Sequence, residues 1–154
     1  MTVHQAQVAA GMLAAVPFAR TLGVEFVDVA PDGAGWRAVV RLPDAPAHQN
    51  HVGGPHAGAM FTLGETASGA VVLAAFGHLL DRATPLAVTA EIGYRRLAMG
   101  DVLATAVLHR PPAEIIAELD AGGRPEFPVP VEISTADGTV TARMTVVWTL
   151  RPQR

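Results

Sequence analysis

One segment of the 154-residue sequence, Ala57 to Leu80, limits the possible folds more than any other. Its apolar residues fall on nearly every side of a helical projection, whereas a helix lying on a protein surface has a polar face. The longest apolar stretch within it is bounded by Glu65 and Asp81, and it falls short of the roughly 20 residues that cross a bilayer. We therefore predict a long central helix, at about residues 57–80, that is surrounded by protein.

Alternation of apolar and polar residues marks the strands that could surround this helix, because successive side chains on a strand point to opposite faces. The clearest pattern runs from Thr139 to Leu150. Further strands are expected at residues 24–29, 36–42, 86–94, 102–110 and 131–135. In the strand at residues 86–94, the side chains expected on the core face are Leu86, Val88, Ala90, Ile92 and Tyr94.

The order of these elements indicates the fold class α+β, with a curved antiparallel sheet wrapped around the long central helix. A further helix is expected at about residues 4–16, and a short one at residues 112–120 that opens with proline and stops at a glycine pair. The chain length suits one domain. We therefore expect residues 1–154 to form a single domain.

Composition excludes several classes of function. The net charge is −3, aromatic residues make up 5% of the chain, and the only adjacent basic pair is Arg95-Arg96, so nucleic acid is not an expected partner. The absence of cysteine excludes a disulfide scaffold, a thiolate metal site and a cysteine nucleophile. The first residues lack the positively charged opening of a secretory signal. A cytoplasmic protein without a membrane partner is expected.

The segment most suggestive of chemistry is the loop that leads into the central helix, residues 50–66, with the sequence NHVGGPHAGAMFTLGET. It resembles the PaaI-like branch of the hotdog-fold thioesterases, whose pattern is an asparagine, a loop, His-Gly-Gly, and an Asp or Glu nine positions after the histidine. Asn50, His56 and Glu65 occupy these places. The sequence around His56, Pro-His-Ala-Gly-Ala, also resembles that of a subgroup known only as a domain of unknown function.

The resemblance implies a hotdog fold, hydrolysis of an acyl-coenzyme A thioester, and a homodimer or homotetramer. This chain departs from the pattern at two positions. Ala57 replaces the first glycine after the histidine but keeps its backbone N–H. Gly69 replaces a hydroxyl that relatives often carry four residues after the carboxylate, and Ser68 is a neighbouring hydroxyl that could substitute for it.

Physical chemistry supports the same assignment. A helix that begins near Ala57 presents free N–H groups and a positive dipole end, so Ala57 and Gly58 could stabilise an oxyanion. A thiol with a pKa of roughly 8.5 leaves without a strong general acid, so one carboxylate, acting as base or as nucleophile, suffices. Glu65 is expected in that role, although a buried structural carboxylate remains the alternative.

Geometry then predicts a dimer. Glu65 lies eight residues beyond Ala57, which places it roughly 12 Å along the helix at about 1.5 Å per residue. One subunit cannot easily bring both groups to one carbonyl. A two-fold dimer in which Glu65 of one chain faces the helix start of the other would produce two composite sites.

The remaining candidate residues each have a structural alternative. His56 could orient the substrate carbonyl or merely cap the helix, and Asn50 could position water or hold the loop. Arg95 and Arg96 could meet coenzyme A phosphates or lie on the solvated surface. Candidate substrate-binding residues that could equally be core or interface are Phe61, Ser68, Gly69 and Tyr94. No metal site or cofactor is expected, apart from coenzyme A as part of the substrate.

The leading hypothesis is therefore an acyl-coenzyme A thioesterase whose partners are its small-molecule substrate and further copies of itself. The alternative from another class is a non-catalytic acyl- or lipid-binding hotdog module, suggested by the missing hydroxyl at Gly69. A hydratase of the same fold ranks third, because no second acid/base pair suited to that chemistry lies near the helix. The sequence does not indicate the acyl chain.

Overall fold

The structure is a computed structural model that describes residues 2–154; Met1, the first residue of the expected domain, lies outside the described residues. The sheet contains six antiparallel strands in the order β1-β2-β4-β5-β6-β3. Its strands are β1 (Glu25–Asp32), β2 (Gly35–Leu42), β3 (Ala83–Tyr94), β4 (Val102–Leu108), β5 (Glu126–Thr135) and β6 (Val140–Pro152). The helices are α1 (Val3–Ala15), α2 (Pro17–Leu22), α3 (Ala57–Phe76) and α4 (Pro112–Asp120), with short 3-10 helices at Pro46–His48 and Gly77–Leu79.

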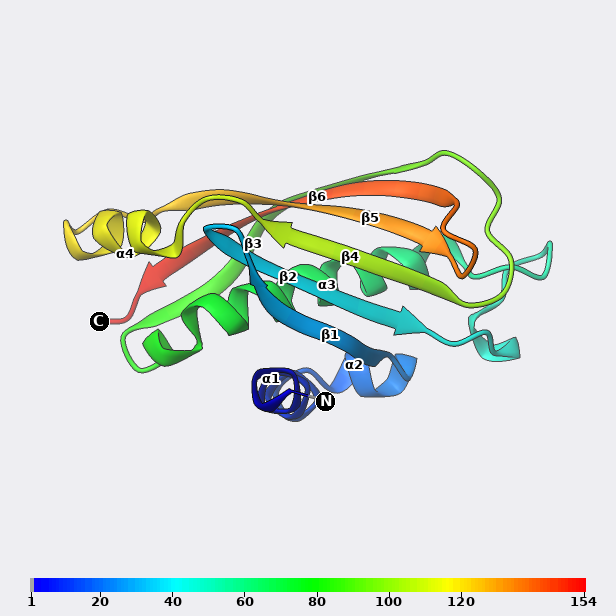
Figure 1. Ribbon diagram of the computed structural model, residues 1–154, viewed down its shortest axis with the longest axis horizontal. Coiled ribbons are helices and arrows are strands. Elements are labelled where there is room, and N and C mark those ends of the chain that lie inside the picture. The colour runs from blue at the N-terminus through cyan, green and yellow to red at the C-terminus, as the bar shows by residue number, and fades with distance from the viewer. Residues whose placement is uncertain (1) are drawn as a thin grey trace.

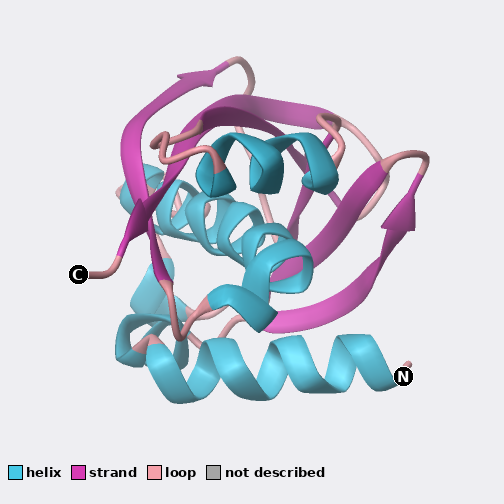
Figure 2. Cartoon of the chain, turned by 90° about the vertical axis from the view of Figure 1, so that its left-hand side faces the viewer, coloured by secondary structure: helices cyan, strands magenta, loops and turns pink. Residues whose placement is uncertain are grey.

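The sheet curves around α3 (Figures 1 and 2), so the predicted α+β class is confirmed. By length and composition alone, Ala57–Leu79 could cross a bilayer, but 72% of its most apolar window is buried within the fold. Gly64 allows close packing on the sheet, since a Cβ atom there would lie 2.6 Å from the Met144 sulfur. This helix is therefore the core of the domain, as its uniform hydrophobicity indicates.

Two elements differ from the sequence prediction for local reasons. β5 begins at Glu126, five residues before the predicted start, and it contains Pro128 and Pro130. β4 pairs only with residues 131–135 of β5, so both prolines lie where β5 has β6 as its sole neighbour. Proline is tolerated there because no second strand needs its missing N–H. The short helix α2, which Pro17 opens, was not predicted.

The predicted core face of β3 was right after the bulge, for Ala90, Ile92 and Tyr94, and wrong before it, for Leu86 and Val88. A bulge at Val88 reverses the alternation, so Ala87 shares a face with Ala90 and Ile92, opposite the inward-facing residues of β6. β3 also lies at the edge of the sheet, and Leu86, Val88 and Tyr94 are 36%, 42% and 46% exposed. The pattern of an edge strand with a bulge cannot be separated from that of a half-buried strand by periodicity alone.

The two edge strands of the sheet, β1 and β3, differ in how far side chains cover their free backbone groups. At β1, the side-chain amide of Gln5 from α1 donates to the Phe26 and Val27 carbonyl oxygens, both at 3.0 Å. A bulge at Val27 further interrupts that edge. Along β3, the hydrogen bonds of the described residues include no such side-chain cover, apart from Gln153 at Thr84. β3 is therefore the edge that is open to pairing.

We expect Gln5→Ala to lower the free energy of unfolding by about 0.5–1.5 kcal/mol, because two strand carbonyls lose their donor. Gln7→Ala is the matched control, since Gln7 is exposed on the same helix. Urea denaturation of both variants measures the effect. Equal stability of the two variants would show that α1 does not seal the β1 edge.

Candidate functional site

The loop before α3 is held by Asn50. Its side-chain oxygen accepts hydrogen bonds from the N–H groups of Val52 (3.0 Å) and Gly54 (3.2 Å), and its amide nitrogen lies 3.4 Å from the Pro55 carbonyl oxygen. The Asn50 backbone N–H also donates to the Gly54 carbonyl, at 2.8 Å. This network favours the loop-forming alternative for Asn50, since its acceptor oxygen is already engaged.

His56 caps the start of α3. Its Nδ1 accepts a hydrogen bond from the Gly58 N–H at 2.8 Å, so Nδ1 carries no proton and, in the neutral ring, the proton resides on Nε2. The His56 side chain is exposed, which leaves Nε2–H available as a donor. Both roles foreseen for His56, capping and carbonyl binding, are compatible with this one ring orientation.

The cap changes which backbone donors are free. Gly58, predicted to contribute an oxyanion donor, gives its N–H to His56 instead. The Ala57 N–H has no acceptor among the hydrogen bonds of the described chain. The free donors at the helix start are therefore the Ala57 N–H and the His56 Nε2–H.

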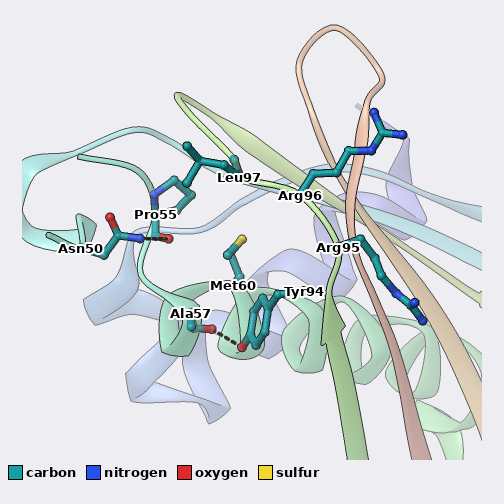
Figure 3. A pocket seen from close by; sticks show the side chains of 9 residues that line it. Asn50, Pro55, Ala57, Met60, Tyr94, Arg95, Arg96 and Leu97 are labelled. Carbon is teal, nitrogen blue, oxygen red and sulfur yellow. Dashed lines mark hydrogen bonds between the residues drawn. The ribbon is translucent and has the colours of Figure 1, made fainter. Parts of the chain in front are cut away.

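A cavity of about 390 Å³ opens at this helix start (Figure 3). The Tyr94 hydroxyl, at the end of β3, donates to the Ala57 carbonyl oxygen at 2.7 Å, and partial burial raises the pKa of Tyr94. The lining residues come from the loop, the first turn of α3 and the segment after β3: Asn50, Pro55, Ala57, Met60, Tyr94, Arg95, Arg96, Leu97 and Ala98. Pro55, Met60, Leu97 and Ala98 were not predicted, because nothing in their local sequence marks a binding site.

Arg95 and Arg96 border this cavity and point to different sides of the chain (Figure 3). Their backbone N–H groups both donate to the Thr141 carbonyl oxygen, at 2.7 and 3.1 Å, which fixes the segment against β6. Both side chains also line a second hollow of about 470 Å³ beside Arg143. Neither guanidinium pairs with a carboxylate in residues 2–154.

Glu65 lies apart from this cavity, two helical turns further along α3. Helical periodicity places it on the same face as Gly58 and Thr62, with Phe61 beside it. Glu65 and Phe61 are both half-buried, and the hydrogen bonds of the described residues include none to the Glu65 carboxylate. Burial raises the pKa of this carboxyl, because the charged form loses water without gaining a partner.

Ser68 and Gly69 do not reach a cavity. The Ser68 hydroxyl is fully buried, donates to the Glu65 carbonyl oxygen at 2.7 Å and accepts from the Trp148 indole N–H at 3.0 Å. A Cβ atom on Gly69 would lie 3.2 Å from the Met12 side chain and 3.6 Å from that of Trp148. The expected contact of these two residues with substrate is therefore corrected, because α1 and Trp148 cover both positions.

The structure thus brings Asn50, His56, Ala57, Tyr94 and the arginine pair together at one end of α3 and leaves Glu65 separate. Among residues 2–154, no three His, Asp or Glu side chains come close enough to hold a metal ion. The His48 carbonyl oxygen accepts a hydrogen bond from the His56 N–H at 2.7 Å, and the His48 ring nitrogen Nδ1 lies 3.4 Å from the Pro43 carbonyl oxygen. A single chain therefore presents the two halves of the candidate site without joining them.

Solved structures with the same architecture include several described as thioesterases. A probable thioesterase of unknown function from Pseudomonas aeruginosa is 26% identical, with a TM-score of 0.82 over 96% of this chain and 95% of that one. A thioesterase family protein from Silicibacter pomeroyi is 23% identical, with a TM-score of 0.73 over 97% and 99%. The E. coli PaaI protein of the phenylacetic acid degradation operon is 18% identical, with a TM-score of 0.70 over 95% and 92%.

These likenesses define the fold: the chain has the hotdog fold, as the resemblance of residues 50–66 predicted. A family model described as a domain of unknown function, DUF4442, matches residues 4–150, and the chain belongs to that family. No curated protein sequence matches the chain.

We expect Ser68→Ala to lower the free energy of unfolding by about 1–3 kcal/mol, because it leaves the buried Trp148 indole N–H without an acceptor. Thermal and urea unfolding followed by Trp fluorescence measure this change. Thr62→Ala is the control, since the Thr62 hydroxyl only donates to the Gly58 carbonyl within an exposed turn. A Ser68→Ala protein as stable as Thr62→Ala would leave the hydroxyl free for another role.

Proposed function

We propose that this protein is an acyl-coenzyme A thioesterase with Glu65 as its catalytic carboxylate. The observation that carries the proposal is the environment of Glu65, an unpaired carboxylate in a core helix whose pKa is raised by burial. A buried carboxylate without a partner lowers the stability of the fold, and such a loss of stability is typical of functional sites. The thioesterase descriptions of the structural neighbours support the same assignment.

The chemistry needs only the groups described above. The Ala57 N–H and the His56 Nε2–H hold the thioester carbonyl oxygen and stabilise the negative charge that develops on it. Glu65 removes a proton from water, the resulting hydroxide attacks the carbonyl carbon, and the carbon–sulfur bond breaks to release coenzyme A and the free acid. In the alternative route Glu65 attacks directly, and water hydrolyses the resulting anhydride.

A second copy of the chain supplies the missing geometry in this proposal. Glu65 and Ala57 of one chain are separated by roughly 12 Å of helix, and Glu65 lies on a half-buried face of α3. The open edge strand β3 offers twelve residues for pairing with another β3. Pairing about a two-fold axis would join two sheets and bring each Glu65 toward the helix start of the partner subunit. Association of such dimers into a tetramer would use other surfaces.

The second candidate is a non-catalytic module that binds an acyl or lipid group. One observation favours it: the position of the relatives' hydroxyl is Gly69, and the neighbouring hydroxyl of Ser68 is enclosed by the Glu65 carbonyl and Trp148. Catalysis by this chain would then proceed without a supporting hydroxyl. Measured hydrolysis of an acyl-coenzyme A thioester distinguishes the thioesterase from the binding module.

We expect Glu65→Ala and Glu65→Gln to lower kcat by at least about 100-fold, because the proton acceptor is lost. Thiol release from short, medium, long and aryl acyl-coenzyme A substrates measures the rate. Equal turnover of wild type and Glu65→Ala would refute the assignment of Glu65. Tight binding of acyl-coenzyme A without turnover by the wild type would support the binding module instead.

The composite site can be tested with mixed dimers. Ala57→Pro removes one N–H while keeping the helix, since proline is favoured at the first helical position and His56 already has extended backbone (φ −61°, ψ 143°). A dimer of one Glu65→Ala chain and one Ala57→Pro chain retains one intact site if sites are shared between subunits. About half of the wild-type activity is then expected, whereas both homodimers are inactive. An inactive mixed dimer would place the whole site within one chain.

Glu65 also predicts a dependence of stability on pH. Its pKa is raised in the folded state, so ionisation destabilises the fold at neutral pH, and the cost disappears as pH falls below the value of about 4.3 for the unfolded chain. Glu65→Gln is therefore expected to be more stable than wild type at pH 7, with the difference shrinking toward pH 4. Thermal unfolding across this range measures it. A Glu65→Gln protein less stable than wild type at pH 7 would indicate a structural carboxylate.

A further inference from the structure

The arginines of this protein fall into paired and unpaired groups. The sequence contains 11 arginines and no lysine. Arg20 is bound to the carbonyl oxygens of Leu13 and Ala14 at the end of α1. Five arginines form ion pairs with carboxylates, namely Arg37, Arg41, Arg82, Arg110 and Arg143. The five that pair with no carboxylate of the described chain are Arg95, Arg96, Arg124, Arg151 and Arg154.

The unpaired arginines lie at the two ends of β3. Arg95 and Arg96 follow its last residue and border the cavity at the start of α3. At the opposite end, Arg124, Arg151 and Arg154 line a hollow of about 830 Å³ together with Thr84. Arg151 is the direct cross-strand neighbour of Thr84, near the first residue of β3. Each end of this strand therefore carries arginines that form no ion pair within residues 2–154.

Symmetry brings the two ends together. Two copies of one edge strand related by a two-fold axis must run antiparallel, so the beginning of one β3 lies beside the end of the other. This step rests on the dimer in the proposed function. In that dimer, Arg95 and Arg96 of one protomer approach Arg124 and Arg151 of the partner subunit. Like charges would repel at such a junction unless an anion lay between them.

We propose that Arg95 and Arg96 of one protomer and Arg124 and Arg151 of the partner subunit form a shared phosphate-binding cleft, with two clefts in each dimer. Guanidinium groups bind phosphate oxygens with two parallel hydrogen bonds, which suits a pyrophosphate and a ribose phosphate. Arg95 and Arg96 also line the cavity where the thioester would lie, so the cleft borders that cavity. The cleft therefore recognises the nucleotide end of coenzyme A and selects free coenzyme A thioesters over thioesters that lack this end.

The first test compares two substrates with the same acyl group, one a coenzyme A thioester and the other an N-acetylcysteamine thioester without phosphates. Arg95→Ala/Arg96→Ala and Arg124→Ala/Arg151→Ala are each expected to raise KM for the coenzyme A thioester about tenfold or more. Neither pair is expected to change kcat/KM for the truncated thioester. The control, Arg37→Ala/Arg41→Ala, removes the same charge from exposed ion pairs on β2, four strands away from β3, and should change neither substrate.

The second test asks whether the partner contributes. In a mixed dimer, one chain carries Arg95→Ala/Arg96→Ala and the other carries Arg124→Ala/Arg151→Ala, and differently tagged chains allow its purification. A shared cleft leaves one wild-type cleft and one that lacks both clusters, so about half of the activity is expected with the wild-type KM. A raised KM for all of the activity would assign both clusters to one chain and overturn the shared cleft.

The outcomes also separate this inference from the proposed function. If both arginine pairs leave KM unchanged while the truncated thioester is hydrolysed in a Glu65-dependent manner, the cleft is refuted and the thioesterase stands. If neither substrate is hydrolysed, the thioesterase is refuted, and calorimetry with coenzyme A and with pantetheine then tests the cleft. Tighter binding of coenzyme A that both arginine pairs abolish supports the cleft, and equal binding of the two ligands overturns it.

Discussion

A helix that is apolar around its whole circumference must be covered on every side, and this constraint determines much of the molecule. The curved sheet covers most of α3, α1 and Trp148 cover the region of Gly69, and Gly64 allows the closest approach to the sheet. The face that carries Gly58, Phe61 and Glu65 receives the least cover. The same helix thus provides both the hydrophobic core and the surface where the proposed chemistry takes place.

The start of α3 shows how a few local bonds define a site. Asn50 closes the loop and His56 caps the helix, and neither interaction requires a ligand. The capping bond nevertheless determines which ring nitrogen carries the proton and which backbone N–H stays free. One orientation of the His56 ring is therefore compatible with both helix capping and the proposed binding of the substrate carbonyl, so these two alternatives do not exclude each other.

Elements governed by local pattern were predictable, whereas those governed by distant neighbours were not. Alternation located β6, the proline and glycine pair located α4, and the resemblance to the PaaI-like pattern related Asn50, His56 and Glu65. The first half of β5 was not predicted, because it contains Pro128 and Pro130. A strand tolerates these prolines only because β4 does not pair with this part of β5. From the sequence, the Ser68 hydroxyl was a candidate substitute for a hydroxyl at position 69. In the structure it accepts a hydrogen bond from Trp148, which is 80 residues away in sequence.

The unequal edges of the sheet also limit how many copies can join through it. Gln5 closes the β1 edge with two hydrogen bonds to strand carbonyls, while β3 remains open. A sheet with two open edges could add copies without end and form a filament. With one open edge in the described part of each chain, pairing through β3 occupies the open strand of both partners, so growth of the sheet terminates at two chains.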